Sequence, residues 1–548
     1  MSSRTPFDTP ASAPTKGPFN NDELPTERLN SSTLVRHTRA PKGLVIASTI
    51  VALILLAPLV FLLIEARGAG VSQVAHLIWR PLTATLLWNT VRLTVAVTAL
   101  CAIIGTLTAW CVERTDLPFR RMWAVLIVIP FAIPDFVIAF GWASLFTWAH
   151  GFYGAVLVMT LAVYPLVYLP VAASLRNADP GLEEAARSLG LGRLQTFFRV
   201  TLSQVRGAIF GGCVLVSLVI LAEYGAFEIL GFRTFTTEIF TEFQLSFNIS
   251  TACALSVVLI LLSGFILGGD WVLRPKGRTA RTGPLAQQSL RRHRLGGAKY
   301  PVLLGFLALV TLALGVPIGA SSYWMARGTR FALSGTSILN AGLHTAFFGT
   351  CAGIIATIGA VPVALLAIRH ASVKARLLER STYLVLAMPG LVIALALSYF
   401  TEHYANSFGY QTTPLLILAY SILFFPLALV GVRASIIHIP IGFEEAARSL
   451  GQSRRRAFLR VTMRIAGPGL AASFCLVFLA TITELTATLL LIPINVQTLS
   501  TQFWAYQQNL SYGQAAPFAL VIILIAAVPS YVISRFFDRL PARASASQ

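Results

Sequence analysis

The chain has 548 residues, of which 56% are hydrophobic and only 12% are charged. About 25% of the residues of an ordinary soluble domain are charged, so this composition excludes a soluble globular protein and indicates several membrane-spanning helices. The formal net charge of +20 comes from an excess of Lys and Arg. Basic stretches such as 291–294 suit the anionic head groups of membrane lipid, and no nucleic-acid partner is expected.

The order of apolar and polar segments gives the layout of the chain. Residues 1–43 are rich in Pro, Ser and Thr and predict a disordered cytoplasmic tail. Twelve apolar segments follow, each long enough to cross a hydrocarbon core that needs about 20 helical residues. A polar linker at 273–300 separates the first six from the last six, and a second cytoplasmic tail covers 536–548. The expected spans are 44–64, 85–112, 122–147, 152–175, 205–230, 250–272, 301–325, 341–368, 379–400, 414–437, 467–492 and 516–535.

The octapeptide Glu-Glu-Ala-Ala-Arg-Ser-Leu-Gly occurs twice, at 183–190 and at 444–451, as a polar island between apolar segments. A shift of 261 positions also aligns its surroundings, with 13 identities in the 20 positions from Glu183 to Leu202. A repeat of this length indicates an internal duplication, with a first unit at 44–272 and a second at 301–535. Because each unit has an even number of spans, the two units have the same orientation in the membrane.

The distribution of Lys and Arg predicts the orientation of the chain. Basic residues near the ends of spans stay on the cytoplasmic side. When the N-terminus is placed in the cytoplasm, 36 of the 42 Lys and Arg residues fall on that side. Both termini, the linker and both copies of the octapeptide are therefore expected to be cytoplasmic.

Each copy of the octapeptide is expected to form a short helix. Pro180 and Pro440 allow a helix to start, the paired glutamates lie near its positive N-terminal end, and the glycine lets the chain turn out of it. A short helix with small alanines can lie in a groove of a partner protein, although an ordinary amphipathic loop is the alternative. The candidate docking residues are Glu183, Glu184, Ala185, Ala186 and Gly190 in the loop 180–203, and Glu444, Glu445, Ala446, Ala447 and Gly451 in the loop 441–464.

Acidic residues inside the expected spans need an explanation, because a buried charge costs about 2.5 to 3.5 kcal/mol on insertion scales. Glu223 and Glu484 are related by the same shift of 261, so they occupy equivalent places in the two units. Two interpretations stay open: they line a central pathway, or they accept hydrogen bonds from neighbouring helix ends. Asp135 aligns with Gly390 and is interpreted as structural.

The sequence contains no phosphate-binding loop, which would read Gly, four residues, Gly-Lys and then Ser or Thr. The chain is therefore not expected to be an enzyme, and a separate subunit must supply the energy of ATP hydrolysis. No segment between spans is long enough to capture a solute, so a separate binding protein is expected outside the membrane. The six cysteines are scattered without a Cys-x-x-Cys pair and are predicted to be packing residues; no cofactor and no metal site is assigned.

The repeated island resembles the EAA loop of ABC-importer permeases, and residues 44–535 as a whole resemble a fused two-unit permease of the type I importer class. This resemblance implies an all-α polytopic fold of about 12 transmembrane helices in two six-helix parallel repeats. It places the chain in a bacterial inner membrane. It also implies two copies of an ATP-binding cassette ATPase, one on each loop, together with an extracytoplasmic solute-binding protein.

The nature of the solute rests on the same resemblance. The fused layout and the sequences at 222–227 and 235–240 look most like those of iron(III) permeases. Hard cations prefer oxygen ligands, which the Glu223 and Glu484 carboxylates supply. Thiamine permeases share the fused layout, so thiamine or another small polar solute is the alternative. An ion-coupled secondary transporter is an alternative of another class; it needs no ATPase and leaves the repeated loop unexplained.

Overall fold

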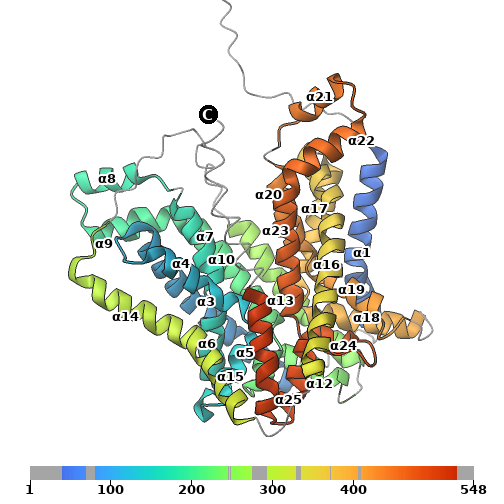
Figure 1. Cartoon of the computed structure of the whole chain (residues 1–548), viewed down its shortest axis with the longest axis horizontal. Coiled ribbons are helices and arrows are strands. Elements are labelled where there is room, and N and C mark those ends of the chain that lie inside the picture. The colour runs from blue at the N-terminus through green and yellow to red at the C-terminus, as the bar shows by residue number, and fades with distance from the viewer. Residues whose placement is uncertain are drawn as a thin grey trace, which may run out of the picture. The chain divides into compact units, whose positions relative to one another are not determined.

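A computed structural model describes residues 40–68, 80–176, 178–244, 246, 249–273, 293–328, 335–370, 372–404, 409–437 and 439–527. The expected tails at 1–43 and 536–548 and the linker at 273–300 fall largely outside these ranges. Within the described ranges the regular elements are helices and there is no β-strand, in agreement with the all-α class (Figure 1).

The first half of the chain contains a series of helices that runs from the first expected span to the linker. They are α1 (Lys42–Gly68), α3 (Pro81–Arg114), α4 (Arg120–Val128), α5 (Asp135–Ala143), α6 (Gly151–Val163), α7 (Pro165–Arg176), α8 (Pro180–Ser188), α9 (Arg193–Thr196), α10 (Leu202–Ala222), α11 (Gly225–Ile229), α12 (Phe235–Gln244) and α13 (Ile249–Leu273). A π-helical turn, Phe197–Thr201, joins α9 to α10.

The second half repeats this order. Its helices are α14 (Lys299–Val310), α15 (Val316–Arg327), α16 (Gly335–Arg369), α17 (Val373–Tyr383), α18 (Gly390–Tyr404), α19 (Thr413–Leu423), α20 (Phe425–Ile436), α21 (Gly442–Ser449), α22 (Arg454–Ala457), α23 (Met463–Ile482), α24 (Thr486–Leu491) and α25 (Leu499–Gln508). A π-helical turn recurs at Phe458–Thr462, the counterpart of the first. The duplication therefore extends to an irregularity of the backbone.

Eight described helices are long and apolar enough to cross a membrane, and three bent pairs of helices raise the number of candidate spans to eleven. A shorter apolar helix, Tyr512–Ala527, lies where the twelfth span is expected. The two halves thus supply the six-span repeats that the sequence predicts.

Three spans that the sequence predicts as continuous helices are bent. The third, expected at 122–147, turns by 91° between Ala132 and Asp135; the ninth, expected at 379–400, turns by 100° between Ala387 and Gly390. Proline lacks a backbone N–H and forces the residue before it into an extended conformation, and Pro134 and Pro389 occupy these two breaks. The tenth span, expected at 414–437, turns by 55° at Phe424.

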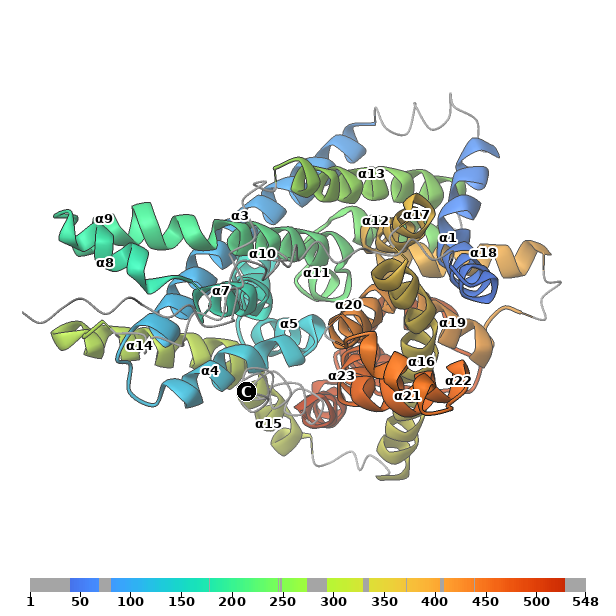
Figure 2. The same ribbon diagram turned by 90° about the horizontal axis from the view of Figure 1, so that it is seen from above.

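The first helix of each half packs against the other half. Helix α1 contacts α16, α17 and α18, and α15 contacts α5 (Figures 1 and 2). Phe61 of α1 packs its ring 5.5 Å from that of Tyr399 and 5.6 Å from that of Phe400, both in α18. Where α15 packs on α5, Gly141 of α5 lets the backbone of Pro317 approach, since a Cβ on Gly141 would lie 2.6 Å from Pro317 Cα. We call α1 and α15 the exchanged helices.

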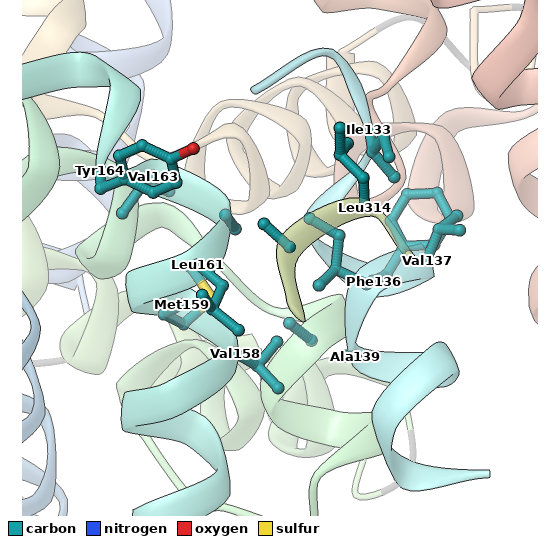
Figure 3. Packing of buried hydrophobic residues seen from close by; sticks show 14 of the residues in the cluster. Ile133, Phe136, Val137, Ala139, Val158, Met159, Leu161, Val163, Tyr164 and Leu314 are labelled. Carbon is teal, nitrogen blue, oxygen red and sulfur yellow. The ribbon is translucent and has the colours of Figure 1, made fainter. Parts of the chain in front are cut away.

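One of the hydrophobic cores among the described residues joins elements of both halves. Leu314, from the π-helical turn between α14 and α15, lies between side chains of α5 and α6, including Phe136 and Leu161 (Figure 3). Phe136 also packs against Phe503 of α25, with ring centroids 5.3 Å apart. The segment that joins α14 to α15 is therefore part of this core, and Leu55 and Leu62 of α1 belong to a second core that also contains residues of both halves.

Close packing within the first half depends on glycine. Helix α7 lies between α3 and α10, and Val167 of α7 meets a glycine on each side. A Cβ on Gly105 of α3 would lie 2.8 Å from Val167 Cβ, and one on Gly212 of α10 would lie 2.8 Å from Val167 Cα. Small residues let helix backbones approach closely in membranes.

We predict that Gly212→Ala destabilises the protein, whereas Gly211→Ala does not. The methyl group at Gly212 has no space beside the Val167 backbone, whereas nothing lies within 4 Å of a Cβ on Gly211. Overpacking of this kind costs about 1 to 3 kcal/mol. Thermal unfolding of the two purified variants measures the difference, and equal midpoints would contradict the prediction.

Candidate functional site

Both copies of the octapeptide form short helices, α8 and α21, at the same end of the molecule, which is the top in Figure 1. Helix α8 begins after Asp179, whose carboxylate accepts a hydrogen bond from the Gly181 N–H at 2.8 Å. Each helix ends at a glycine with positive φ, 85° at Gly190 and 84° at Gly451. Glycine adopts this conformation at little cost, so the turn out of each helix is the one expected from the sequence.

The first glutamate of α8 points inward and ties the helix to two long helices. Glu183 is 6% exposed. It accepts a hydrogen bond from the Thr201 hydroxyl at 2.8 Å, and Nη2 of Arg114 lies 3.9 Å from the same oxygen. Arg114 is the last residue of α3 and Thr201 directly precedes α10. We call Arg114, Glu183 and Thr201 the first anchor.

The second half contains an equivalent group, the second anchor, formed by Arg369, Glu444 and Thr462. Arg369, the last residue of α16, forms an ion pair with Glu444 at 2.8 Å. The Thr462 hydroxyl donates a hydrogen bond to the same carboxylate, and α23 begins at the next residue. The duplication has therefore kept the attachment of the short helix as well as its sequence.

The anchors keep both glutamates ionised. Burial by itself would raise the pKa of Glu183, but hydrogen bonds from His293 and Thr201 and the charge of Arg114 outweigh burial and hold the pKa below its usual value. At Glu444, burial is likewise outweighed by Arg369 and Thr462, and the pKa is lowered. Both carboxylates are thus charged acceptors at neutral pH.

The candidate docking residues fall on two faces of their helices. Glu183 and Ala186 are buried and Glu444 and Ala447 are half-buried, so these four attach the helices to the long helices beneath them. The exposed residues are Glu184, Ala185 and Gly190 in the first copy, and Glu445, Ala446 and Gly451 in the second.

Sequence reasoning missed the apolar side chains of the exposed face. Leu182 and Phe443 are equivalent and are 52% and 53% exposed, and Leu189 and Leu450 are each 83% exposed. Both leucines are the seventh residue of the octapeptide, so the repeat itself held the signal. Sequence reasoning also missed the anchor arginines, Arg114 and Arg369. They are related by a shift of 255, the same shift that aligns Thr90 with Thr345.

The pair Glu223 and Glu484 lies where long helices end. Helix α10 ends before Glu223, whose Oε1 accepts a hydrogen bond from the Ala226 N–H at 2.7 Å at the start of α11. Likewise Glu484 follows α23, and its Oε1 accepts from the Ala487 N–H at 2.9 Å at the start of α24. Each half-buried carboxylate therefore satisfies a backbone donor of a short helix that restarts after a break.

Hydroxyl groups surround these breaks in both halves. Thr90 accepts a hydrogen bond from the Phe235 N–H at 3.3 Å, and Thr345 accepts from the Leu499 N–H at 3.0 Å. A small pocket of about 10 Å³, roughly the room that one water molecule needs, lies beside Glu484. Its lining is mostly polar: Thr345, Phe348, Tyr420, Thr481, Ile482, Glu484, Thr498 and Ser500.

The breaks after α10 and α23, which Glu223 and Glu484 cap and which we call the carboxylate breaks, meet where the two halves join. A Cβ on Gly225 would lie 2.8 Å from the Leu485 side chain and 3.1 Å from Phe136 Cβ, so the residues next to Glu223, Glu484 and Asp135 are in contact. Asp135, which directly precedes Phe136, is therefore at the same junction as the pair. Among the described residues, no three His, Cys, Asp or Glu side chains come together to hold a metal ion.

One protein-family model matches the chain twice, at residues 101–272 and 349–545. Its description is binding-protein-dependent transport system inner membrane component. One match falls in each half, and each includes one anchor, one octapeptide helix and one carboxylate break. The duplicated unit is therefore the unit of this family.

Individual relatives agree with the family match. The chain is 35% identical over 501 residues to the Fe(3+)-transport system permease protein FbpB 2 of Haemophilus influenzae, which covers 91% of this chain and 99% of that protein. It is 28% identical over 217 residues to the molybdenum transport system permease protein ModB of Escherichia coli, covering 34% of this chain and 93% of the relative. The spermidine/putrescine transport system permease protein PotB of Haemophilus influenzae is 25% identical over 214 residues, covering 35% of this chain and 74% of that protein.

The extent of these matches distinguishes relatives that have one family unit from a relative that has two units in one chain. The ModB and PotB matches cover about a third of the chain, whereas the FbpB 2 match covers both halves. The chain therefore belongs to the family of binding-protein-dependent transport system inner membrane components, and it is a multi-pass ABC-importer permease in which two family units are fused.

Proposed function

We propose that this permease moves iron(III) across the inner membrane. The observation that carries this proposal is its 35% identity, over 91% of its length, to a permease named for Fe(3+) transport. The carboxylate breaks support it, because Glu223 and Glu484 place oxygen ligands, which hard cations prefer, where the two halves meet. Iron is the cargo in this proposal, delivered by a solute-binding protein outside the membrane.

Energy comes from two copies of an ATP-binding cassette ATPase, one docked on α8 and one on α21. The exposed apolar side chains at Leu182, Leu189, Phe443 and Leu450 suit a hydrophobic groove on such a partner. In this arrangement the end of the molecule that carries α8 and α21, both chain termini and the linker face the cytoplasm. The chain itself hydrolyses no ATP, and anionic lipid neutralises its basic cytoplasmic side.

The anchors provide a mechanical route from the docking helices to the carboxylates. Helix α10 starts one residue after Thr201 and ends one residue before Glu223, and it has 21 residues. At 1.5 Å per residue it is about 30 Å long. In the second half, α23 connects Thr462 to the break at Glu484 in the same way. A displacement of either docking helix by ATP binding is thereby transmitted along one long helix to the region between the halves.

The units proposed for this mechanism are 44–272 and 301–535, joined by the linker and flanked by the tails. Because α1 and α15 pack against the opposite half, neither unit is expected to work when it is expressed alone. The exchanged helices α1 and α15 hold the two units together.

Solute specificity is tested with the assembled transporter. Proteoliposomes that contain the chain with its copurified ATPase, and that are supplied with the binding protein, should accumulate iron(III) in the presence of Mg-ATP. Thiamine, sulfate, molybdate and spermidine serve as competing solutes. Uptake of one of these instead of iron, with ATPase present, would overturn the iron assignment and leave the permease assignment intact. A chain that purifies and transports without any ATPase would contradict both.

The docking role of α8 and α21 predicts that Gly190→Val together with Gly451→Val prevents ATPase association. Valine at φ 85° or 84° is strained, so the end of each helix must rearrange. Gly192→Val is the matched control, because Gly192 follows the same helix, has no positive φ and has nothing within 4 Å of a Cβ. Copurification of the ATPase should fall at least tenfold in the double variant and stay normal in the control. Normal solute-stimulated ATP hydrolysis by the double variant would refute docking.

A pathway role for Glu223 and Glu484 predicts that Glu223→Gln together with Glu484→Gln lowers iron uptake strongly at normal abundance. The Gln amide oxygen can still accept the hydrogen bond from the Ala226 or Ala487 N–H, so the helix restart is preserved while the charge is lost. Replacement of both glutamates by Leu removes the acceptor as well, which costs about 1 to 3 kcal/mol per unsatisfied donor and should reduce stability. Full uptake by the Gln variant would exclude a pathway role for the charges and leave both residues with the role of capping a helix.

A further inference from the structure

The residues that lead into α14 lie beside α8, the first docking helix, although the two segments are far apart in the sequence. The backbone N–H of His293 donates to the Arg114 carbonyl at 2.9 Å, and the Asp116 N–H donates to the His293 carbonyl at 3.1 Å. The Asp116 carboxylate then accepts from the Leu295 N–H at 2.8 Å. Three hydrogen bonds therefore fix the entry into the second half to the end of α3.

The imidazole of His293 touches α8 itself. Its Nε2 lies 3.5 Å from a carboxylate oxygen of Glu183, and Nη2 of Arg187 lies 3.0 Å from its Nδ1 and 3.1 Å from its Nε2. The ring also stacks on Trp110, with centroids 6.2 Å apart and an interplanar angle of 29°. Glu183 and Arg187 are one helical turn apart on the same face of α8. A neutral imidazole that carries its proton on Nε2 donates toward Glu183 and accepts from Arg187, and so bridges this turn.

The second docking helix has no such bridge in the described part of the chain. Arg448 of α21 is the counterpart of Arg187, and no described residue forms a hydrogen bond or an ion pair with it in the place of His293. The counterpart of Trp110 is Leu365, which offers no aromatic face to an imidazole. The two helices share the octapeptide and the anchor. They differ in the Asp179 cap, which has no side-chain equivalent at the start of α21, and in this contact from the segment before α14.

We propose that His293 is a positioning residue that clamps the first docking helix to the start of the second half, so that α8 and α21 are held unequally. The clamp consists of His293, Arg187, Trp110 and Asp116. Displacement of α8 then acts on α14 as well as on α3 and α10, whereas displacement of α21 acts, within the described part of the chain, through the second anchor. This inference rests on the proposed docking of both helices, and it assigns them different mechanical loads.

Amide hydrogen exchange in the full-length purified chain tests the clamp without any partner. The octapeptides are identical, so their interior amides share the same intrinsic exchange chemistry and any difference reports the structure around them. Exchange in α8 should be slower than in α21 on the order of tenfold, which is the effect of one or two net hydrogen bonds. His293→Ala should speed exchange in α8 toward the rate of α21 and leave α21 unchanged.

Matched variants separate the clamp from general loosening. Arg187→Ala should reproduce the effect of His293→Ala in α8, whereas Arg448→Ala, its counterpart, should change neither helix. Arg294→Ala is the neutral neighbour, because Arg294 is exposed beside His293. His293→Gln should restore slow exchange, since its amide can donate to Glu183 and accept from Arg187. Equal exchange of α8 and α21 in the wild-type chain, or a Gln variant no slower than the Ala variant, would overturn the clamp.

The consequence for coupling is measured as Mg-ATP hydrolysis by the chain copurified with its ATPase in nanodiscs. His293→Ala should lower hydrolysis at least twofold and His293→Gln should restore it. If exchange in α8 responds as expected while hydrolysis does not, the clamp stands and its role in coupling to ATP hydrolysis is refuted. If Gly190→Val and Gly451→Val abolish ATPase association while exchange in α8 ignores His293, docking stands and the clamp is refuted.

Discussion

The structure depends on how helices are broken inside a membrane. A broken helix leaves backbone N–H groups without partners, and hydrocarbon offers none, so each break must be satisfied by side chains. In both halves a glutamate that ends a long helix accepts the N–H of the short helix that follows, at Glu223 for α11 and at Glu484 for α24. Thr90 and Thr345 do the same for the next restart, at α12 and α25.

These satisfied breaks place polar groups where the halves meet. The bend at Pro134 turns α5 toward α11, and the bend at Pro389 turns α18 toward α24. The Leu485 side chain consequently packs against Gly225 across the junction. The carboxylates that cap these helices thus belong to breaks that lie at one junction, so the capping and pathway interpretations of Glu223 and Glu484 are compatible. A charge that caps a helix end is held in a fixed place, which is what a polar route through a membrane requires.

The fused chain is more than two copies of one unit in series. The first helix of each half is exchanged, with Phe61 packed on α18 and Leu314 in the core between α5 and α6. The anchors are repeated closely, whereas Asp135 aligns with Gly390 in the second copy, and among the described residues none contacts α21 as His293 contacts α8. Duplication therefore preserved the interactions on which each half depends, and the differences are concentrated where the halves meet each other.

The sequence by itself determined the class of fold, the duplication and the two short helices, because apolar length, composition and an exact repeat are local properties. It also located Glu223 and Glu484 through their common shift of 261. It could not reveal the bends of 91° and 100°, since a proline permits a break or only a kink, and packing selects between them. The inward turn of Glu183 toward Arg114, the exchange of α1 and α15, and the contact of His293 with α8 join residues far apart in the chain. Only the tertiary structure decided these, because the free energy of such contacts comes from burial and charge pairing that no stretch of sequence contains alone.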